Sequence, residues 1–169
     1  MKTGKIGAIG AIKSGFTVNK KISLEQKMSG LNADEIRGEL AKMDEWSKAL
    51  VFDANCKVIA EMNCAVPENE VSALPKAYEG RDQAIGPGLT VNGVRYEVHR
   101  FHPPLIYGRT GNCDVGEGVS IARGKDKNGN VVYLLICYEL PIISARAVPQ
   151  QIEFFNKHLG VLDSFTDNK

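Results

Sequence analysis

The stretch Gly88–Arg100, GLTVNGVRYEVHR, decides the fold because it encodes two short strands joined by a tight turn. Asn92-Gly93 is the dipeptide that most readily accepts the positive φ values of a two-residue hairpin turn. The residues after the turn alternate between two predicted faces, with Val94, Tyr96 and Val98 on one and Arg95, Glu97 and His99 on the other. The pattern predicts a half-buried antiparallel strand whose outer surface carries long charged side chains suited to contact with a partner.

Composition and charge limit the classes of protein to which the chain can belong. The chain has 169 residues, of which 43% are hydrophobic and 24% charged, as is ordinary for one globular domain. The net charge of +1 argues against a general nucleic-acid binder. Residues 1–27 hold six lysines and one acidic residue, so this segment carries +5 and the other 142 residues carry −4. A basic arm therefore precedes a mildly acidic domain, and we place the boundary between residues 1–30 and 31–169.

The basic arm allows two interpretations. Its isoleucines and Phe16 recur every three to four residues, which is the spacing of an amphipathic helix on a membrane surface. Four glycines interrupt this pattern, and each costs about 1 kcal/mol relative to alanine in a helix. The segment is therefore predicted either to be a flexible tail or to become ordered on anionic lipid or against the domain.

The rest of the chain predicts an α+β fold. We expect about six strands in a central antiparallel sheet, sandwiched by N- and C-terminal helices. Capping boxes predict a helical turn from Ser23 and a helix over 33–45, the latter with Ile36, Leu40 and Met43 on its apolar face. The other predicted elements, in chain order, are strands 48–52 and 57–62, a short helix from Pro67 to Pro75, a loop over 79–88, the central hairpin, strands 105–109, 119–122 and 131–138, a connection over 141–148 and a helix over 149–162 that begins at Pro149.

The sequence predicts no catalytic, metal or cofactor site. The four cysteines have no C-x-x-C spacing and do not cluster with histidines, which argues against zinc. Gly118–Asp126 is similar to a phosphate-binding loop, but its spacing is one residue too long and Asp126 stands where a magnesium-binding hydroxyl is needed. Gly7 and Gly10 do not follow a strand, as a dinucleotide site requires. Cys113 with His99 or His102 lacks the signature of a thiol nucleophile and its base.

The sequence also indicates a location. The N-terminus has no apolar region of the length that a signal peptide needs. No apolar run approaches the roughly 18 residues that span a bilayer. We therefore expect a soluble cytoplasmic protein in a reducing compartment.

Five segments in the same order resemble the profilin family. Residues 67–100 are similar to the middle of profilins, where a proline-led short helix, a loop ending in Gly-Leu and a basic strand follow one another. The other four similar segments are KALVFDANCKVIAEM at 48–62, YGRTG at 107–111, GEGVSIARGK followed by VVYLLICYEL within 116–140, and QQIEFFNKHL at 150–159. The likeness covers about residues 33–165. It identifies the chain as a divergent, microbial-type profilin with an N-terminal extension and an inserted loop at Asn112–Gly116.

The resemblance implies a non-enzymatic, monomeric protein that binds monomeric actin and regulates actin polymerisation, in association with the cytoskeleton. The implied actin contacts come from the strand meander and the last helix: Arg95, Val98, Arg100, Arg109, Arg123, Arg146, Gln151 and Glu153. The residue types support actin binding independently, because long basic groups on an exposed sheet face suit an acidic partner surface.

The resemblance implies two further ligands. Profilins bind proline-rich segments between their terminal helices, and the matching or displaced positions here are Trp46, Ile59, His158, Leu159 and Phe165. The usual aromatic pair of the first helix is absent, since Ile36 and Leu40 stand near those positions. Phosphoinositide head groups are the second implied ligand, and their predicted partners, besides Arg95 and Arg100, are Lys2, Lys5, Lys13, Lys20 and Lys21.

Two other functions stay open at the level of sequence. One is a small-molecule or peptide-sensing α+β domain that does not bind actin, because a fold by itself does not define a function. A buried ligand cavity would favour this alternative, whereas a filled core with a basic exposed face favours the profilin interpretation. The other is a hydrolase that uses Cys113.

Overall fold

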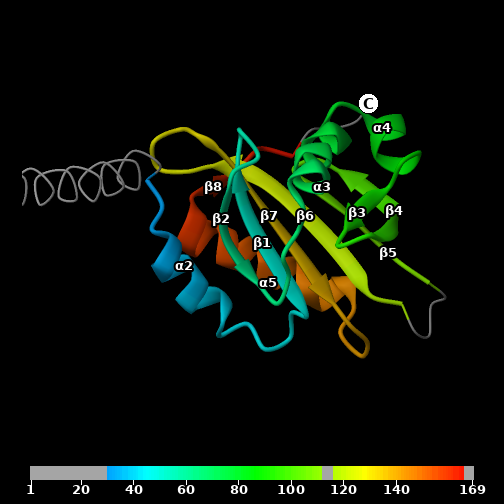
Figure 1. The fold of residues 1–169 in the computed structure, drawn as a ribbon, viewed down its shortest axis with the longest axis horizontal. Helices are drawn as coiled ribbons and strands as arrows, with labels where there is room; N and C mark the ends of the chain where they lie inside the picture. Colours follow the sequence, from blue (N-terminus) through cyan, green and yellow to red (C-terminus); the bar gives the residue numbers. More distant parts are fainter. Residues whose placement is uncertain (1–29, 112–115, 166–169) are drawn as a thin grey trace, which may run out of the picture.

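In the computed structural model, which describes residues 30–111 and 116–165, a curled antiparallel sheet carries helices on both faces (Figure 1). The strands are β1 (Lys48–Asp53), β2 (Val58–Met62), β3 (Leu89–Val91), β4 (Val94–His102), β5 (Leu105–Arg109), β6 (Gly118–Lys125), β7 (Val131–Tyr138) and β8 (Val161–Leu162). The helical segments are α2 (Ala33–Leu40), α3 (Glu68–Ala73), the 3-10 turn η1 (Leu74–Tyr78), α4 (Arg81–Ile85), α5 (Ser144–Phe154) and the π-helical turn η2 (Phe155–Leu159). The predicted α+β class is confirmed.

The strand order is β2-β1-β7-β6-β5-β4-β3, and β8 pairs with the C-terminal end of β6. Each face of this sheet has its own hydrophobic core. The first core lies under α2, α5 and η2, and the second lies under α3, η1 and α4. Strand β7 contributes Leu134 and Ile136 to the first core and Leu135 and Cys137 to the second. Because both of its faces are covered, β7 is a nearly continuous apolar run, and its predicted central position is confirmed.

The hairpin of β3 and β4 forms as the sequence predicts. Asn92 and Gly93 have φ values of 51° and 76°, which are the left-handed conformations of the two-residue turn. The predicted inward face is confirmed for Tyr96 and Val98, which are buried in the second core. Val94 differs from the prediction because it lies next to the turn, where it is 42% exposed.

Helix α2 begins where the capping box predicts. The Asn32 side chain accepts hydrogen bonds from the backbone N–H groups of Asp34 and Glu35, at 3.1 and 3.3 Å. The helix ends at Leu40, five residues earlier than predicted, and the chain continues in tight turns. These turns bring Trp46 into the first core, where its ring packs edge-on against Phe154 at a centroid distance of 5.4 Å. Burial of the tryptophan thus outweighs the helical pattern of residues 41–45.

Several predicted boundaries are wrong. The loop predicted over 79–88 contains α4, and the helix predicted to end near Pro75 continues as η1. Helix α5 begins at Ser144 inside the predicted connection, so Pro149 lies within the helix instead of starting it. The last helical turn ends at Leu159, and the residues Val161 and Leu162 form β8 in place of the predicted helix end. Tertiary packing sets these ends, since each segment covers part of a core that local pattern does not reveal.

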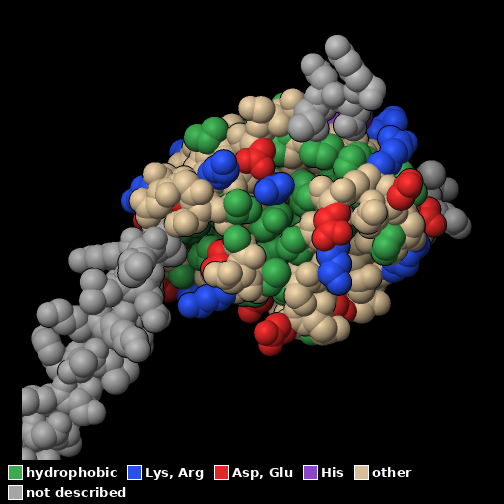
Figure 2. Space-filling view, turned by 90° about the horizontal axis from the view of Figure 1, so that it is seen from above, with side chains coloured by type: hydrophobic (Ala, Val, Ile, Leu, Met, Phe, Trp, Pro, Cys, Tyr) green, Lys and Arg blue, Asp and Glu red, His purple; other side chains and the backbone are tan. Residues whose placement is uncertain are grey.

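Other predictions fall on parts of the chain outside the described residues. These are the basic arm up to residue 29 with its capping box at Ser23, and the inserted loop, of which only Gly116 is described. Figure 2 shows the described surface from above, where hydrophobic side chains gather in the centre among charged side chains of both signs. This face therefore does not present charge of a single sign.

Candidate interaction surface

Strands β4 and β5 carry a group of basic side chains on the face of the sheet that holds the first core. The register pairs Glu97 with Arg109 and Arg100 with Tyr107, so these four side chains lie on one face. Helix α5 packs over β6 and β7, nearer the middle of the sheet (Figure 1). Glu97 and Arg100 are exposed, and Tyr107 and Arg109 are half-buried. We call this surface, with Arg95 at its edge, the basic face.

Arg95 is held in place by the loop after α4. Its Nε and Nη2 atoms donate to the carbonyl oxygens of Pro87 and Gly86, at 2.9 and 3.1 Å. Its Nη1 atom lies 4.0 Å from Glu97, whose other oxygen lies 3.8 Å from His99. The side chain is still 51% exposed, so a fixed guanidinium remains accessible to a partner.

Arg109 is the last residue of β5, where the turn to β6 begins. Its Nη1 atom donates a short hydrogen bond to the carbonyl oxygen of Gly116. Its guanidinium carbon lies 6.0 Å from the centre of the Tyr138 ring, at the outer limit of a cation–π contact. Burial raises the pKa of Tyr138 to about 12, although the nearby Arg109 cation opposes this shift. The phenol therefore stays neutral beneath the arginine.

A β-bulge sets which residues of β4 face outward. Pairing passes from Val98 with Gly108 to Arg100 with Tyr107, so His99 is the extra residue. The two strands approach closely here: a Cβ added at Gly108 would lie 1.7 Å from the carbonyl oxygen of Glu97. Only glycine fits, and the bulge returns Arg100 to the same face as Glu97.

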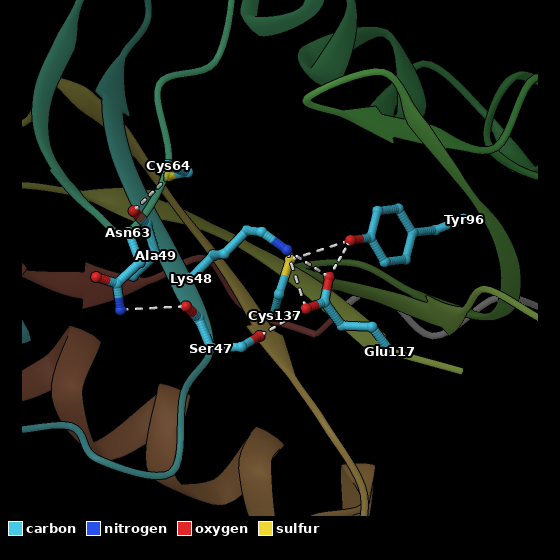
Figure 3. Close-up of polar contacts among 8 residues, drawn as sticks. All are labelled: Ser47, Lys48, Ala49, Asn63, Cys64, Tyr96, Glu117 and Cys137. Atoms are coloured by element: carbon cyan, nitrogen blue, oxygen red, sulfur yellow. Dashed lines mark hydrogen bonds and ion pairs between the residues drawn. The ribbon is translucent and has the colours of Figure 1, made fainter. Parts of the chain in front are cut away.

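A partly buried polar cluster lies behind the basic face, at the edge of the second core (Figure 3). The carboxylate of Glu117 accepts hydrogen bonds from Lys48 at 2.9 and 3.0 Å, from Ser47 at 2.8 Å and, through a short bond, from Tyr96. The Cys137 thiol lies 3.7 Å from the Tyr96 hydroxyl. We call these five residues the Glu117 cluster.

The pKa values in the Glu117 cluster follow from burial and pairing. Burial alone would raise the pKa of Glu117, but the hydrogen bonds from Tyr96, Lys48 and Ser47 outweigh it and hold that pKa below its ordinary value. Burial would lower the pKa of Lys48, and its bond to Glu117 raises it instead. The ion pair is therefore charged at neutral pH. No sequence signal identified this cluster, since a glutamate between two glycines has the pattern of an exposed turn residue.

The structure separates the eight predicted actin-contact residues. Arg95, Arg100 and Arg109 come together on the basic face. Val98 is buried in the second core, and Gln151 is fully buried, with its Nε2 donating to the carbonyl oxygens of Ser120 and Leu134 at 3.0 and 2.9 Å. We leave both out of the candidate surface, because their side chains do not reach it.

The remaining three predicted contacts lie elsewhere. Arg123 points to the other face of the sheet, 5.8 Å from the Tyr78 ring centre and 3.5 Å from the Asp163 carboxylate. Arg146 lies in α5 and forms a two-pronged ion pair with Glu45. Glu153 is exposed on the same helix. Arg123 is therefore not part of the basic face.

A groove lies between α2 and η2, where the family resemblance predicts proline-rich ligands. It has a volume of about 300 Å³, and its lining includes the titratable side chains of Glu35, Glu39, Lys157 and His158. Its described lining contains no Trp, Tyr or Phe.

The residues predicted for proline-rich binding only partly meet this groove. His158 borders it, with Nε2 3.7 Å from Glu39 and its ring 4.6 Å from that of Phe154. Trp46 and Leu159 are buried in the first core, and Ile59 is half-buried and lines a separate hollow of about 280 Å³. Phe165, the last described residue, is 61% exposed. The structure thus brings His158 and Leu159 to the groove without an aromatic platform.

Of the other residues named in the sequence analysis, some lie outside the described part of the chain. The five arm lysines predicted to contact phosphoinositides, and Cys113, lie outside the described residues. His99 and His102 are exposed on β4. Residues 30–111 and 116–165 contain no group of three or more side chains that could hold a metal ion. Within these same ranges, no helix combines the length and the apolar character needed to cross a membrane.

Comparison with solved structures defines the class: the chain has the profilin fold. Profilin II of Acanthamoeba castellanii superposes with a TM-score of 0.57 at 19% sequence identity, covering 69% of this chain and 87% of that protein. Profilin of Schizosaccharomyces pombe superposes with a TM-score of 0.55 at 16% identity, covering 74% and 94%. LokiProfilin1, in its complex with rabbit actin, superposes with a TM-score of 0.56 at 15% identity, covering 74% and 92%. No family model and no curated protein matches the sequence.

Proposed function

We propose that this protein binds monomeric actin through the basic face and so regulates actin polymerisation, without catalysing a reaction. One observation carries the proposal: Arg95, Arg100 and Arg109 lie on one face of the sheet in a profilin fold, and Arg95 and Arg100 are exposed there. A protein of the same fold, LokiProfilin1, has been solved in a complex with rabbit actin. We expect this protein to be monomeric when it binds actin.

The chemistry of the basic face supports an acidic protein partner. Guanidinium groups bind carboxylates in two-pronged geometry and cost less to desolvate than ammonium groups. Arg95 and Arg109 are already held by backbone carbonyls, so binding orders few side-chain torsions. Apolar contact can come from Leu140 and Ile143, which are 38% and 51% exposed on the connection that follows Tyr138, the residue beneath Arg109. Charged residues around an apolar contact are the usual anatomy of a specific interface.

We infer two secondary ligands from the sequence resemblance. Anionic phosphoinositide head groups would bind the arm lysines Lys2, Lys5, Lys13, Lys20 and Lys21 together with Arg95 and Arg100. Because this set shares two arginines with the basic face, lipid and actin should compete. Proline-rich peptides would bind the groove between α2 and η2 beside His158. We expect that binding to be weak, because stacked aromatic side chains normally supply most of the contact.

The ligand-sensing alternative has less support. The hollow of about 300 Å³ lies between the terminal helices and is lined mainly by polar and charged residues. The hollow of about 280 Å³ lies beside two hairpin turns, and its lining mixes apolar side chains such as Ile59 and Val132 with polar ones such as Asp53. Both faces of the sheet are filled by their own cores.

The test is spontaneous polymerisation of fluorescently labelled actin with increasing amounts of the full chain. We expect a longer lag before filaments appear, in proportion to the concentration of added protein. The same measurement on a chain that lacks residues 1–30 reports whether the arm opposes binding. An unchanged lag with both proteins, each shown to be folded by circular dichroism, would contradict the proposed function.

A further inference from the structure

Glu117 is a partly buried charge with several partners. Its side chain is 13% exposed, and that of Lys48, which forms two of its hydrogen bonds, is 26% exposed. Tyr96, which donates to the same carboxylate, is fully buried. A carboxylate withdrawn from water is costly unless its lone pairs are bonded. Here Tyr96, Lys48 and Ser47 together satisfy both oxygens.

The partners of Glu117 come from strands that are not its neighbours. Glu117 directly precedes β6, whereas Lys48 begins β1 and Tyr96 lies in β4. In the sheet, β7 separates β1 from β6, and β5 separates β4 from β6. The view in Figure 3 shows the three side chains converging from different strands. One carboxylate therefore connects three segments that backbone pairing does not join directly.

The backbone around Glu117 holds the turn that carries Arg109. The Glu117 carbonyl accepts from the N–H of Thr110 at 2.9 Å, and the carbonyl of the preceding residue, Gly116, accepts from the Arg109 guanidinium. The position of Gly116 depends on where Glu117 is anchored, since the two are covalently adjacent. The location of the Arg109 guanidinium thus depends on the Glu117 carboxylate.

We propose that Glu117 is a positioning residue for the basic face: its carboxylate anchors the root of the β5–β6 turn and, through the Gly116 carbonyl, sets the position of Arg109. This inference rests on the proposed actin-binding function for its consequence, but not for the anchoring itself. A glutamine at position 117 has the same shape and cannot accept hydrogen bonds at both terminal atoms. It also leaves Lys48 without a counter-charge.

The anchoring is tested without actin, by amide hydrogen exchange of the full chain. In Glu117→Gln, we expect the Thr110 amide and the first residues of β6 to exchange about tenfold faster, as for loss of a coupled hydrogen-bond network. The distant pairing of Val51 with Ala60 serves as an internal reference. Glu61→Gln is the matched control, because Glu61 is an exposed carboxylate on β2. Tyr96→Phe, which removes one hydroxyl and keeps the ion pair, replaces Glu117→Gln if that variant does not fold. Unchanged exchange at Thr110 would overturn the proposal.

The consequence for binding is tested by a double-mutant cycle with labelled actin. Glu117→Gln should weaken binding by about tenfold in the native chain and have little further effect in Arg109→Ala. Its effect should persist in Arg100→Ala, because Arg100 is on β4, away from the turn. An equal loss in all three backgrounds would show that Glu117 does not act through Arg109. If the native chain does not bind actin, the proposed function is wrong, and the exchange result alone decides whether Glu117 anchors the turn.

Discussion

Tyr96 donates its hydroxyl to the carboxylate of Glu117, although β5 lies between β4, which carries Tyr96, and β6, which Glu117 directly precedes. Both side chains lie on the second-core face, and a tyrosine and a glutamate are long enough to meet across one intervening strand, since neighbouring strands lie about 4.8 Å apart. The neighbours of Tyr96 in sequence, Arg95 and Glu97, point to the opposite face and contribute to the basic face. Strand β4 therefore links the Glu117 cluster to the basic face.

Removing the Tyr96 hydroxyl should destabilise the fold. Tyr96→Phe leaves a partly buried carboxylate with one donor fewer, and hydrogen bonds to charged groups contribute about 1.5–3 kcal/mol. We expect the free energy of unfolding in urea to fall by about that amount. Tyr107→Phe is the matched control, since Tyr107 is a half-buried tyrosine on the first-core face. Equal stabilities of Tyr96→Phe and the native chain would contradict the assigned bond.

Stability should depend on pH through Glu117. Its pKa is held below the ordinary value in the folded protein, so the folded state binds its proton less readily than the unfolded state does. The resulting stabilisation is present above the ordinary pKa and is lost as the pH falls through the lowered folded pKa, in the region below about pH 4.5. Urea unfolding at a series of acidic pH values measures this. Glu117→Gln should be less stable at neutral pH and show a shallower acid dependence; parallel pH curves for the two proteins would refute the assignment.

Charge reversal on the basic face should weaken actin binding. Arg100 is exposed and has no intramolecular ion pair among the described residues, so Arg100→Glu changes the surface without breaking an internal contact. We expect the dissociation constant for monomeric actin to rise by about tenfold or more, most strongly at low salt. Lys57→Glu makes the same charge change at an exposed site between β1 and β2 and should bind as the native chain does. Equal affinities for the two variants would remove Arg100 from the surface.

Trp46 should report on the first core and not on ligands. It is 3% exposed and packs against Phe154, and it is the only tryptophan in the chain. We expect its fluorescence emission to lie at short wavelength in the folded protein and to shift to longer wavelength on unfolding in urea. A proline-rich peptide that binds the groove should leave the emission unchanged. Strong quenching by the peptide would place Trp46 in the binding site instead.

Cys137 should be chemically inert in the folded protein. It is fully buried, and burial raises the pKa of its thiol to about 12, so almost no reactive thiolate forms at neutral pH. Mass spectrometry after brief alkylation at about pH 8 should find Cys137 modified only when the protein is unfolded. Cys56, which is half-buried beside the β1–β2 turn, serves as the more accessible comparison. Rapid labelling of Cys137 in the native state would contradict its burial.

Local sequence determined the elements whose cause is local. Asn92-Gly93 imposes the hairpin because these two residues accept positive φ, and Asn32 starts α2 because its side chain satisfies two free N–H groups. The apolar run of β7 predicted a central strand because a strand covered on both faces has no polar side. Alternation along β4 likewise predicted that Arg95 and Glu97 face outward and that Tyr96 faces the core.

Only the tertiary structure decided which charged residues meet and which are buried. Arg100 joins Arg109 because a bulge at His99 changes the register, and Arg123 lies on the other face because of its position in β6. Glu117 is partly buried because Tyr96 and Lys48 reach it from strands that are distant in the chain. A charged residue can be buried only where such partners are already in place, and pairings between distant strands are not encoded in local spacing. The sequence alone thus predicted the strands and the basic character of the surface, whereas the register of the sheet, with its bulge at His99, selected the residues that form it.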